Sequence, residues 1–288
     1  MASLRESAAL SVATAEPLLR VSDVRKTYKG PHGERTEALA NVSLTVASGE
    51  LVALVGPSGC GKTTLLAIIA GLEEPDSGEV ALRGDPGARR LGQVSYMPQR
   101  DLLLPWRDAL GNAIAGLQVQ GVPRAEAERR ARGLFAAFGL SGFERAFAPT
   151  LSGGMRQRVA FARTALVTRD LMLLDEPFGA LDALTRAELR RWLAEIWGKL
   201  GATCLLVTHD VDEALLLADR IYALTPRPGR VALERTVPLS GPRDLADLAR
   251  PEMAALKAEL LAALEGEPAI PPHTPAIQGR EAEQGGAR

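Results

Sequence analysis

Cysteine, long apolar runs and an excess of charge of either sign are all scarce in this chain of 288 residues. Only Cys60 and Cys204 occur, far apart and without metal-ligating neighbours, which argues against a disulfide framework and suits a reducing compartment. No apolar run reaches the roughly 18 to 20 residues needed to span a bilayer, and the N-terminus lacks the apolar core of a secretory signal. The formal net charge of -1 creates no global field that favours nucleic acid or anionic lipid. We therefore expect a soluble chain, so that any role at a membrane requires a second chain to supply the membrane part.

What the sequence contains instead is an alternation of strand and helix patterns. Apolar runs predict strands over residues 18–28, 40–46, 51–55, 80–82, 93–97, 171–174 and 204–208, and helices over 63–70 and 184–200. A turn is expected over 74–78, and a hairpin over 221–233. Residues 106–167 have a helical pattern broken by glycine and proline. This order predicts an α/β fold with a largely parallel sheet and an inserted helical stretch.

The two ends of the chain differ from this pattern. Residues 1–17 are expected to form a flexible tail, and residues 241–265 a helical extension. Residues 266–288 are rich in Pro, Gly and Glu with little to bury, so we expect them to be disordered.

The sharpest motif is a phosphate-binding loop between the strand at 51–55 and the helix that follows. The residues that match G-x-x-x-x-G-K-[ST] are Gly56, Pro57, Ser58, Gly59, Cys60, Gly61, Lys62 and Thr63, and Thr64 continues the binding segment. Glycines let the backbone curl so that N–H groups point at phosphate oxygens, and the helix adds its positive end. We expect Lys62 to reach the β- and γ-phosphates of ATP, Thr63 to ligate Mg²⁺, and Cys60 merely to fill space. A chance glycine-rich turn is the alternative, and the flanking strand and helix argue against it.

A second candidate site is the pair Asp175 and Glu176 at the end of the apolar strand 171–174. Ligands of α/β folds sit at this edge of the sheet. We expect Asp175 to hold Mg²⁺, directly or through water, and Glu176 to activate the attacking water as a general base. Solvated acids at a strand end are the alternative, which a nearby phosphate loop makes weaker.

The segment Leu151-Ser152-Gly153-Gly154-Met155-Arg156-Gln157-Arg158 forms a possible second anion site. Ser152 can cap the following helix, while Gly153 and Gly154 leave backbone N–H groups uncovered. Because the chain already has one phosphate loop, the ATP of a partner best explains this second site.

This segment resembles the signature sequence of ABC-type ATPases, and with the other motifs the resemblance covers residues 18–240. It implies a P-loop NTPase (RecA-like) mixed-sheet core, an inserted helical subdomain at about 100–165 and an antiparallel β subdomain. It further implies ATP and Mg²⁺ as cofactors, and a head-to-tail pair of copies that enclose ATP between phosphate loop and signature. Gly179 and Met155 depart from the usual residues, serine and glutamine.

The resemblance also assigns roles to four further residues. Tyr28 would stack on adenine, although it could be merely a strand aromatic. Gln99 would sense Mg²⁺ and the γ-phosphate, Asp182 would lie in the loop that crosses the dimer interface, and His209 would contact the γ-phosphate. Glu176, His209 and Gln99 are thus the predicted catalytic residues, and Thr63, Gln99 and Asp175 the predicted metal ligands.

Several features favour a transporter subunit over other ABC-type ATPases. A single set of motifs and the lack of sustained heptads argue against a soluble member that acts on a macromolecule. The presence of both Glu176 and His209 argues against a non-catalytic nucleotide sensor. The apolar cluster from Leu102 to Trp106 is either a packed hinge or a docking groove for a short helix of a membrane subunit; we favour docking.

The cargo is less well indicated by the sequence. Residues 96–107 and 225–229 look like the nitrate, sulfonate and taurine importer group, whose relatives also move vitamin precursors. The prediction is an ATP-hydrolysing subunit, peripheral at the cytoplasmic face of the cell inner membrane, that energises import of a small solute. Its expected partners are a second copy, a polytopic permease and indirectly a periplasmic or lipid-anchored solute-binding protein, with no nucleic acid.

Overall fold

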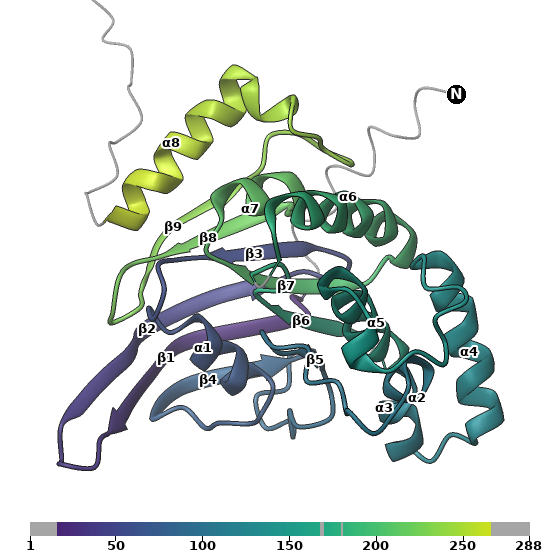
Figure 1. Ribbon diagram of the computed structural model, residues 1–288. Coiled ribbons are helices and arrows are strands. Elements are labelled where there is room, and N and C mark those ends of the chain that lie inside the picture. The colour runs from purple at the N-terminus through teal and green to yellow at the C-terminus, as the bar shows by residue number, and fades with distance from the viewer. Residues whose placement is uncertain (1–15, 168–169, 180, 266–288) are drawn as a thin grey trace, which may run out of the picture.

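The computed structural model describes residues 16–167, 170–179 and 181–265 (Figure 1). The tails expected over 1–17 and 266–288 therefore lie outside the described residues, apart from residues 16 and 17.

The centre of the molecule is a six-stranded sheet with the strand order β5-β6-β7-β3-β8-β9. The strands are β5 (Ser95–Met97), β6 (Leu171–Asp175), β7 (Thr203–Thr208), β3 (Leu51–Val55), β8 (Arg220–Leu224) and β9 (Val231–Thr236). All neighbours are parallel except β8 and β9, which form the expected hairpin. Every residue of β3, β6 and β7 is buried, as in parallel strands covered on both faces. The predicted α/β fold with a mixed sheet is confirmed.

A second, antiparallel sheet has the order β2-β1-β4, with β1 at Leu19–Lys29, β2 at Arg35–Val46 and β4 at Ser77–Leu82. Two boundaries differ from the sequence prediction. β2 begins at Arg35 rather than Ala40, because its polar first half pairs with the end of β1 as far as Lys29. The expected turn at 74–78 ends early, because Ser77 already pairs with Arg25 of β1.

Alternate residues of the central sheet face two separate cores. Val52 and Leu54 of β3 pack with helix α1 (Lys62–Ile69) and with the three-stranded sheet. Leu51, Ala53 and Val55 face the other core, which contains residues of α5 (Gly153–Leu166), α6 (Ala183–Leu200), α7 (Val211–Leu217) and α8 (Pro251–Glu265). Figure 1 shows α6 and α7 running along the central sheet. The sheet is thus packed on both faces, which fixes the position of β3 and of the loop that joins β3 to α1.

The helical stretch consists of several short helices and one longer helix before α5. These are α2 (Ala109–Ala113), α3 (Ala115–Val119), α4 (Arg124–Ala137) and the 3₁₀ turn η1 (Ala148–Thr150); a second 3₁₀ turn, η2 (Asp247–Ala249), precedes α8. Three aromatic rings join this part to α5 and α6. The centroid of Phe138 lies 4.7 Å from that of Trp192 and 5.6 Å from that of Phe161.

Within the described ranges, none of the helices combines the length and the apolar character that crossing a membrane requires. Cys60 and Cys204 are both free and buried.

Candidate nucleotide site

The phosphate loop leaves β3 at Val55 and enters α1 at Lys62. Gly59 and Gly61 have φ angles of 77° and 107°, a region that favours glycine. A Cβ on Gly61 would also lie 2.6 Å from the carbonyl oxygen of Ala38, so a side chain there would collide with β2. Cys60 is buried within the loop, and burial raises the pKa of its thiol, in keeping with a side chain that only fills space.

A cavity of about 510 Å³ opens above this loop. Its lining contains nine of the predicted residues: Tyr28, Ser58, Gly59, Gly61, Lys62, Thr63, Thr64, Gln99 and Glu176. It also contains three residues that the sequence did not reveal, namely Thr36, Ala38 and Arg227. Gly56 and Pro57 contribute carbonyl oxygens instead, which accept hydrogen bonds from Lys62 Nζ at 2.7 and 3.0 Å. The cavity wall therefore combines the buried ammonium group of Lys62, from the loop, with the half-exposed ring of Tyr28, from β1.

Asp175, at the end of β6, lies beside the start of α1. The Thr63 hydroxyl donates a hydrogen bond to Asp175 Oδ1 at 3.3 Å, and Tyr96 donates one to Oδ2 at the same distance. Asp175 is only 1% exposed, and burial raises its pKa above the ordinary aspartate value, opposed by these two hydrogen bonds. A hydroxyl and a carboxylate side by side are hard oxygen donors of the kind that Mg²⁺ takes from proteins, which leave its other positions to phosphate and water. The residues present thus fit the expected cation.

Glu176 is the point where three separate segments converge. Its Oε2 accepts a hydrogen bond from Gln99 Nε2 at 3.1 Å and lies 3.2 Å from His209 Nδ1. Its Oε1 lies 3.8 Å from Lys62 Nζ. The backbone φ of Glu176 is 45°, an unusual value for a residue with a side chain, and such values often mark functional sites. The parallel strands β5, β6 and β7 all end at this edge of the sheet, which explains why Gln99, Glu176 and His209 meet there.

The predicted signature residues lie elsewhere. Ser152 is exposed and caps α5, because its hydroxyl accepts a hydrogen bond from Met155 N–H at 3.3 Å. Gly154 is buried, and a Cβ there would lie 2.7 Å from Thr185 of α6, so its missing side chain also lets the two helices approach. Asp182 caps α6 through hydrogen bonds from the N–H groups of Leu184 and Thr185. None of Ser152, Gly153, Gly154 and Asp182 lines the cavity of their own chain's phosphate loop.

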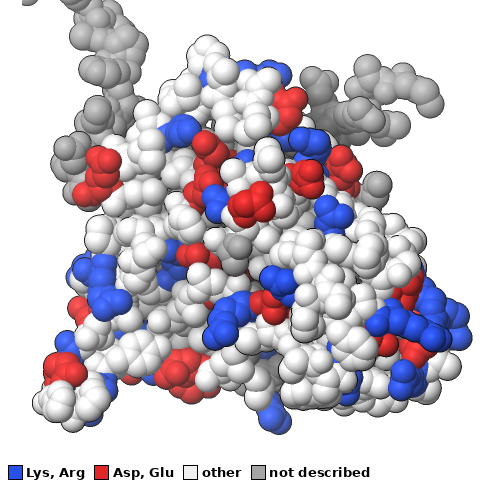
Figure 2. Space-filling view, viewed as in Figure 1, with Lys and Arg blue, Asp and Glu red and all other residues white. Residues whose placement is uncertain are grey.

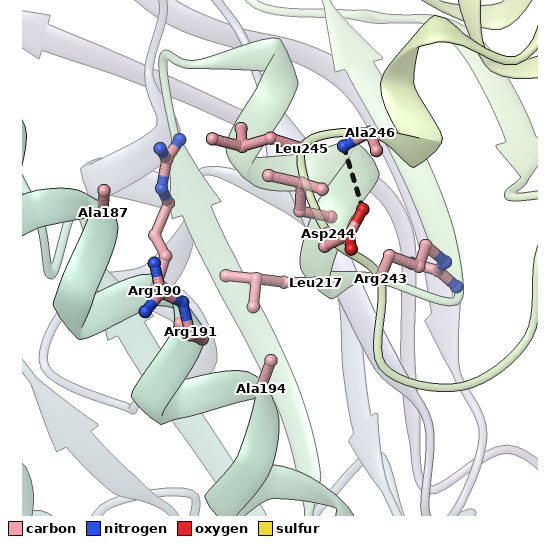
Figure 3. Close-up of a pocket in the computed structure, with 10 residues that line it drawn as sticks. Ala187, Arg190, Arg191, Ala194, Leu217, Arg243, Asp244, Leu245 and Ala246 are labelled. Carbon is pink, nitrogen blue, oxygen red and sulfur yellow. Dashed lines mark hydrogen bonds between the residues drawn. The ribbon is translucent and has the colours of Figure 1, made fainter.

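Figure 3 shows a second cavity, of about 420 Å³, between α6, α7 and residues 243–246. Arg190 and Arg191 line one wall and Leu217 and Leu245 face them. Arg243 is occupied by the carbonyl oxygens of Leu215, Ala218 and Leu239. The described lining of this second cavity includes neither a glycine-rich loop nor a paired hydroxyl and carboxylate. The nucleotide chemistry therefore belongs to the first cavity, above the phosphate loop.

A glycine-rich loop between a parallel strand and a helix, with an acidic pair at the end of another parallel strand of the same sheet, defines a P-loop nucleotide-binding protein. Comparison of the chain with known proteins identifies the family within this class. The family model described as ABC transporter matches residues 39–179. The chain is 45% identical to the taurine import ATP-binding protein TauB of Yersinia pestis, over 74% of this chain and 82% of that protein. It is 43% identical to the formylaminopyrimidine import ATP-binding protein ThiZ of Halalkalibacterium halodurans, over 72% and 81% respectively.

Solved structures agree. The dimeric post-hydrolysis state of an ATP-binding cassette bound to ADP and Pi has a TM-score of 0.67 and 31% identity, and covers 77% of this chain and all of that one. The chain therefore belongs to the ABC transporter family, and it is an ATP-binding protein that hydrolyses ATP.

Proposed function

We propose that this chain energises the import of a small solute by hydrolysing ATP beneath a membrane permease. The observation that carries the proposal is the position of Gln99: its amide contacts the candidate base Glu176, while the segment that follows it is apolar and exposed. A short segment thus connects the site of hydrolysis with a surface suited to another chain. The names of the relatives support import as the process.

The roles within the nucleotide site follow from its geometry. Lys62 is buried with an ammonium group that now bonds two carbonyl oxygens, and bound phosphate would offer it stronger, charged acceptors. Thr63 and Asp175 would hold Mg²⁺, which neutralises charge on the phosphates; Gln99 is proposed as a third ligand once it leaves Glu176. Glu176 would take the proton of the attacking water, and His209 would stabilise the charge that develops on the γ-phosphate.

A second copy of the chain is proposed to complete each site. Ser152, Gly153 and Gly154 form a capped helix start that is remote from the chain's own cavity, and Asp182 starts the neighbouring helix. A head-to-tail pair would place each Ser152 against the ATP of the other copy, where the positive end of α5 favours anionic phosphate. The dimeric state of the solved relative supports this arrangement.

The permease would dock on the surface that follows Gln99. Leu102 is 53% exposed, Trp106 73% and Phe147 48%. Trp106 and Phe147 also line a depression of about 290 Å³. The rest of its lining is Gly111 and Ile114 with the polar residues Arg107, Asp108, Gln118 and Arg124. Exposed large apolar side chains around a depression are typical of contact sites. This exposure favours docking over the packed hinge, although Leu103 does pack against the core.

The remaining expectations are also proposals. Residues 18–240 would form the ATP-binding domain, with a helical subdomain at about 100–165 and a helical extension over 241–265. The chain would be peripheral at the cytoplasmic face of the membrane, and a solute-binding protein would deliver the cargo. Because TauB and ThiZ are named for different solutes, we propose a small solute of the taurine, sulfonate or nitrate kind, with a vitamin precursor as the second candidate.

Uptake by cells tests this function. Deletion of the gene should abolish uptake of one of radiolabelled taurine, an alkanesulfonate, nitrate or formylaminopyrimidine. The wild-type gene should restore that uptake, and a Lys62→Ala variant should not. Trp106→Ala should hydrolyse ATP normally as an isolated chain but fail to restore uptake. Unchanged uptake of all four solutes after deletion would contradict the proposal in its present form.

A further inference from the structure

Arg227 stands at the edge of the nucleotide cavity, in the hairpin between β8 and β9. Its Nε donates a hydrogen bond to the carbonyl oxygen of Gly59 at 2.9 Å. Its Nη2 lies 3.2 Å from the position that a Cβ on Gly59 would occupy. Among the residues that the structure describes, no carboxylate pairs with Arg227, and its two terminal nitrogens have no hydrogen-bond acceptor. The guanidinium group is therefore held through Nε, and its two terminal nitrogens are available to donate hydrogen bonds to a ligand.

The hairpin that carries Arg227 is itself held against the phosphate loop. Gly229 N–H donates to Ala38 O at 3.0 Å, and Gly229 O accepts from Ala40 N–H at 3.0 Å. A Cβ on Gly229 would lie 2.2 Å from Cys60 O, so only glycine permits this close approach. Within the turn, the Thr225 hydroxyl donates to Pro228 O at 3.1 Å and accepts from Arg230 N–H at 3.1 Å. Arg227 thus lies in a turn that is stabilised by internal hydrogen bonds and contacts both β2 and the phosphate loop.

We propose that Arg227 is a nucleotide-binding residue, which holds the phosphate loop through Nε and binds the phosphate chain of ATP through its terminal nitrogens. Gly59 has a φ of 77°, and its carbonyl oxygen accepts the hydrogen bond from Arg227, so the arginine is held directly at the phosphate loop. A guanidinium group matches phosphate oxygens in a forked geometry that lysine lacks. Lys62 is the other cation in the described lining of the cavity, opposed by Glu176. A second cation would therefore add affinity for a highly anionic ligand.

This inference requires that the chain binds ATP, and it is independent of transport. The test measures displacement of a fluorescent ATP analogue from the full chain by ATP, by ADP and by adenosine. Arg227→Ala should weaken the binding of ATP and ADP about tenfold, the effect of losing a charge-assisted hydrogen bond at a partly exposed site. It should leave adenosine binding unchanged. Arg227→Lys should recover part of the loss, because the charge remains but the fork does not.

Two controls make the result decisive. Arg230 is an exposed arginine of the same hairpin that does not line the cavity, so Arg230→Ala should bind all three ligands like the wild type. Lys62→Ala should lose ATP binding; if it does while Arg227→Ala binds ATP like the wild type, the role of Arg227 is refuted and the phosphate site stands.

Equal losses of ATP and adenosine binding in Arg227→Ala would also overturn the inference, because they would indicate a structural role alone. If that variant does not fold, Arg227→Gln decides the matter. Its amide can still donate to Gly59 O, so it should remain folded yet bind ATP about as weakly as we expect for the alanine variant; binding as tight as the wild type would contradict the proposal.

Discussion

Ser152 offers a perturbation that separates a structural role from a functional one. Its hydroxyl caps α5 by accepting the Met155 N–H at 3.3 Å, and the side chain is exposed. Ser152→Ala removes the cap, which costs about 1 kcal/mol of unfolding free energy and, for a chain of this size, lowers the melting temperature by about 2–4 °C. Ser152→Asp keeps the cap, because aspartate is an equally good cap, and its charge favours the helix N-terminus by a further ~0.3–1 kcal/mol.

The two variants should behave oppositely in stability and alike in ATP-driven pairing. A hydrogen bond to a charged phosphate contributes about 1.5–3 kcal/mol. A symmetric pair contains two such sites, so Ser152→Ala should weaken the pair by about 3–6 kcal/mol, a factor of roughly 10² to 10⁴ in its dissociation constant. Ser152→Asp should weaken it at least as much, because a carboxylate would face phosphate.

Sedimentation equilibrium with Mg²⁺ and ATP, in a Glu176→Gln background that slows hydrolysis, measures the pairing, and thermal unfolding measures the cap. The expected result for Ser152→Asp is full stability without a nucleotide-dependent dimer. A Ser152→Asp protein that still pairs with ATP as tightly as its parent would refute the placement of Ser152 against a partner's phosphate.

Three further predictions concern the site and its support. Glu176→Gln should bind Mg²⁺ and ATP but release phosphate at least about 100-fold more slowly, since the base is lost; wild-type turnover would remove Glu176 from that role. Asp175→Asn should abolish Mg²⁺-dependent ATP hydrolysis while raising the melting temperature of the nucleotide-free chain at pH 7. The folded-state pKa of Asp175 lies above its unfolded value, so the ionised carboxylate destabilises the fold at pH values above the folded pKa. The stability gained by the asparagine variant should therefore shrink as the pH falls towards the ordinary aspartate pKa near 4. A stability gain that grows on acidification would contradict this. Phe138→Ala should lower the unfolding free energy by about 3–5 kcal/mol in urea titrations, because the ring is fully buried against Phe161 and Trp192; a loss under 1 kcal/mol would show that the aromatic cluster does not join the helical part to the core.

The sequence predicted those parts of the fold that carry a local signal. Strands β3, β6 and β7 are continuous apolar runs, because parallel strands are covered on both faces, and their bounds fall within a residue of the prediction. The first half of β2 was missed because it is polar and is fixed by pairing with β1, which no local pattern reveals.

The site residues likewise fall into those that a local sequence motif identifies and those that only the fold brings together. The phosphate loop is contiguous, so its sequence motif alone identified half of the residues that line the cavity. The meeting of Gln99, Glu176 and His209 depends on the neighbouring order β5-β6-β7, which the residues themselves do not specify. Arg227 was missed for a related reason: the motif around it was noticed, but its contact with Gly59 joins residues 168 positions apart.

The surface offers less guidance than the site. Figure 2 shows lysine and arginine interspersed with aspartate and glutamate over much of the visible face, in keeping with the net charge of -1. No broad patch of one charge sign is visible on that face. The apolar side chains around Trp106 are therefore the better indication of where the proposed permease would dock.

The dependence of specific ATPase activity on protein concentration tests the central claim most directly, namely that two copies of this chain enclose and hydrolyse ATP together. With saturating Mg²⁺ and ATP, the rate per chain should rise with concentration and level off once pairs predominate, and Ser152→Asp should stay at the low level throughout. A wild-type rate per chain that is the same from high dilution to high concentration, with sedimentation showing monomers at both ends, would contradict the account.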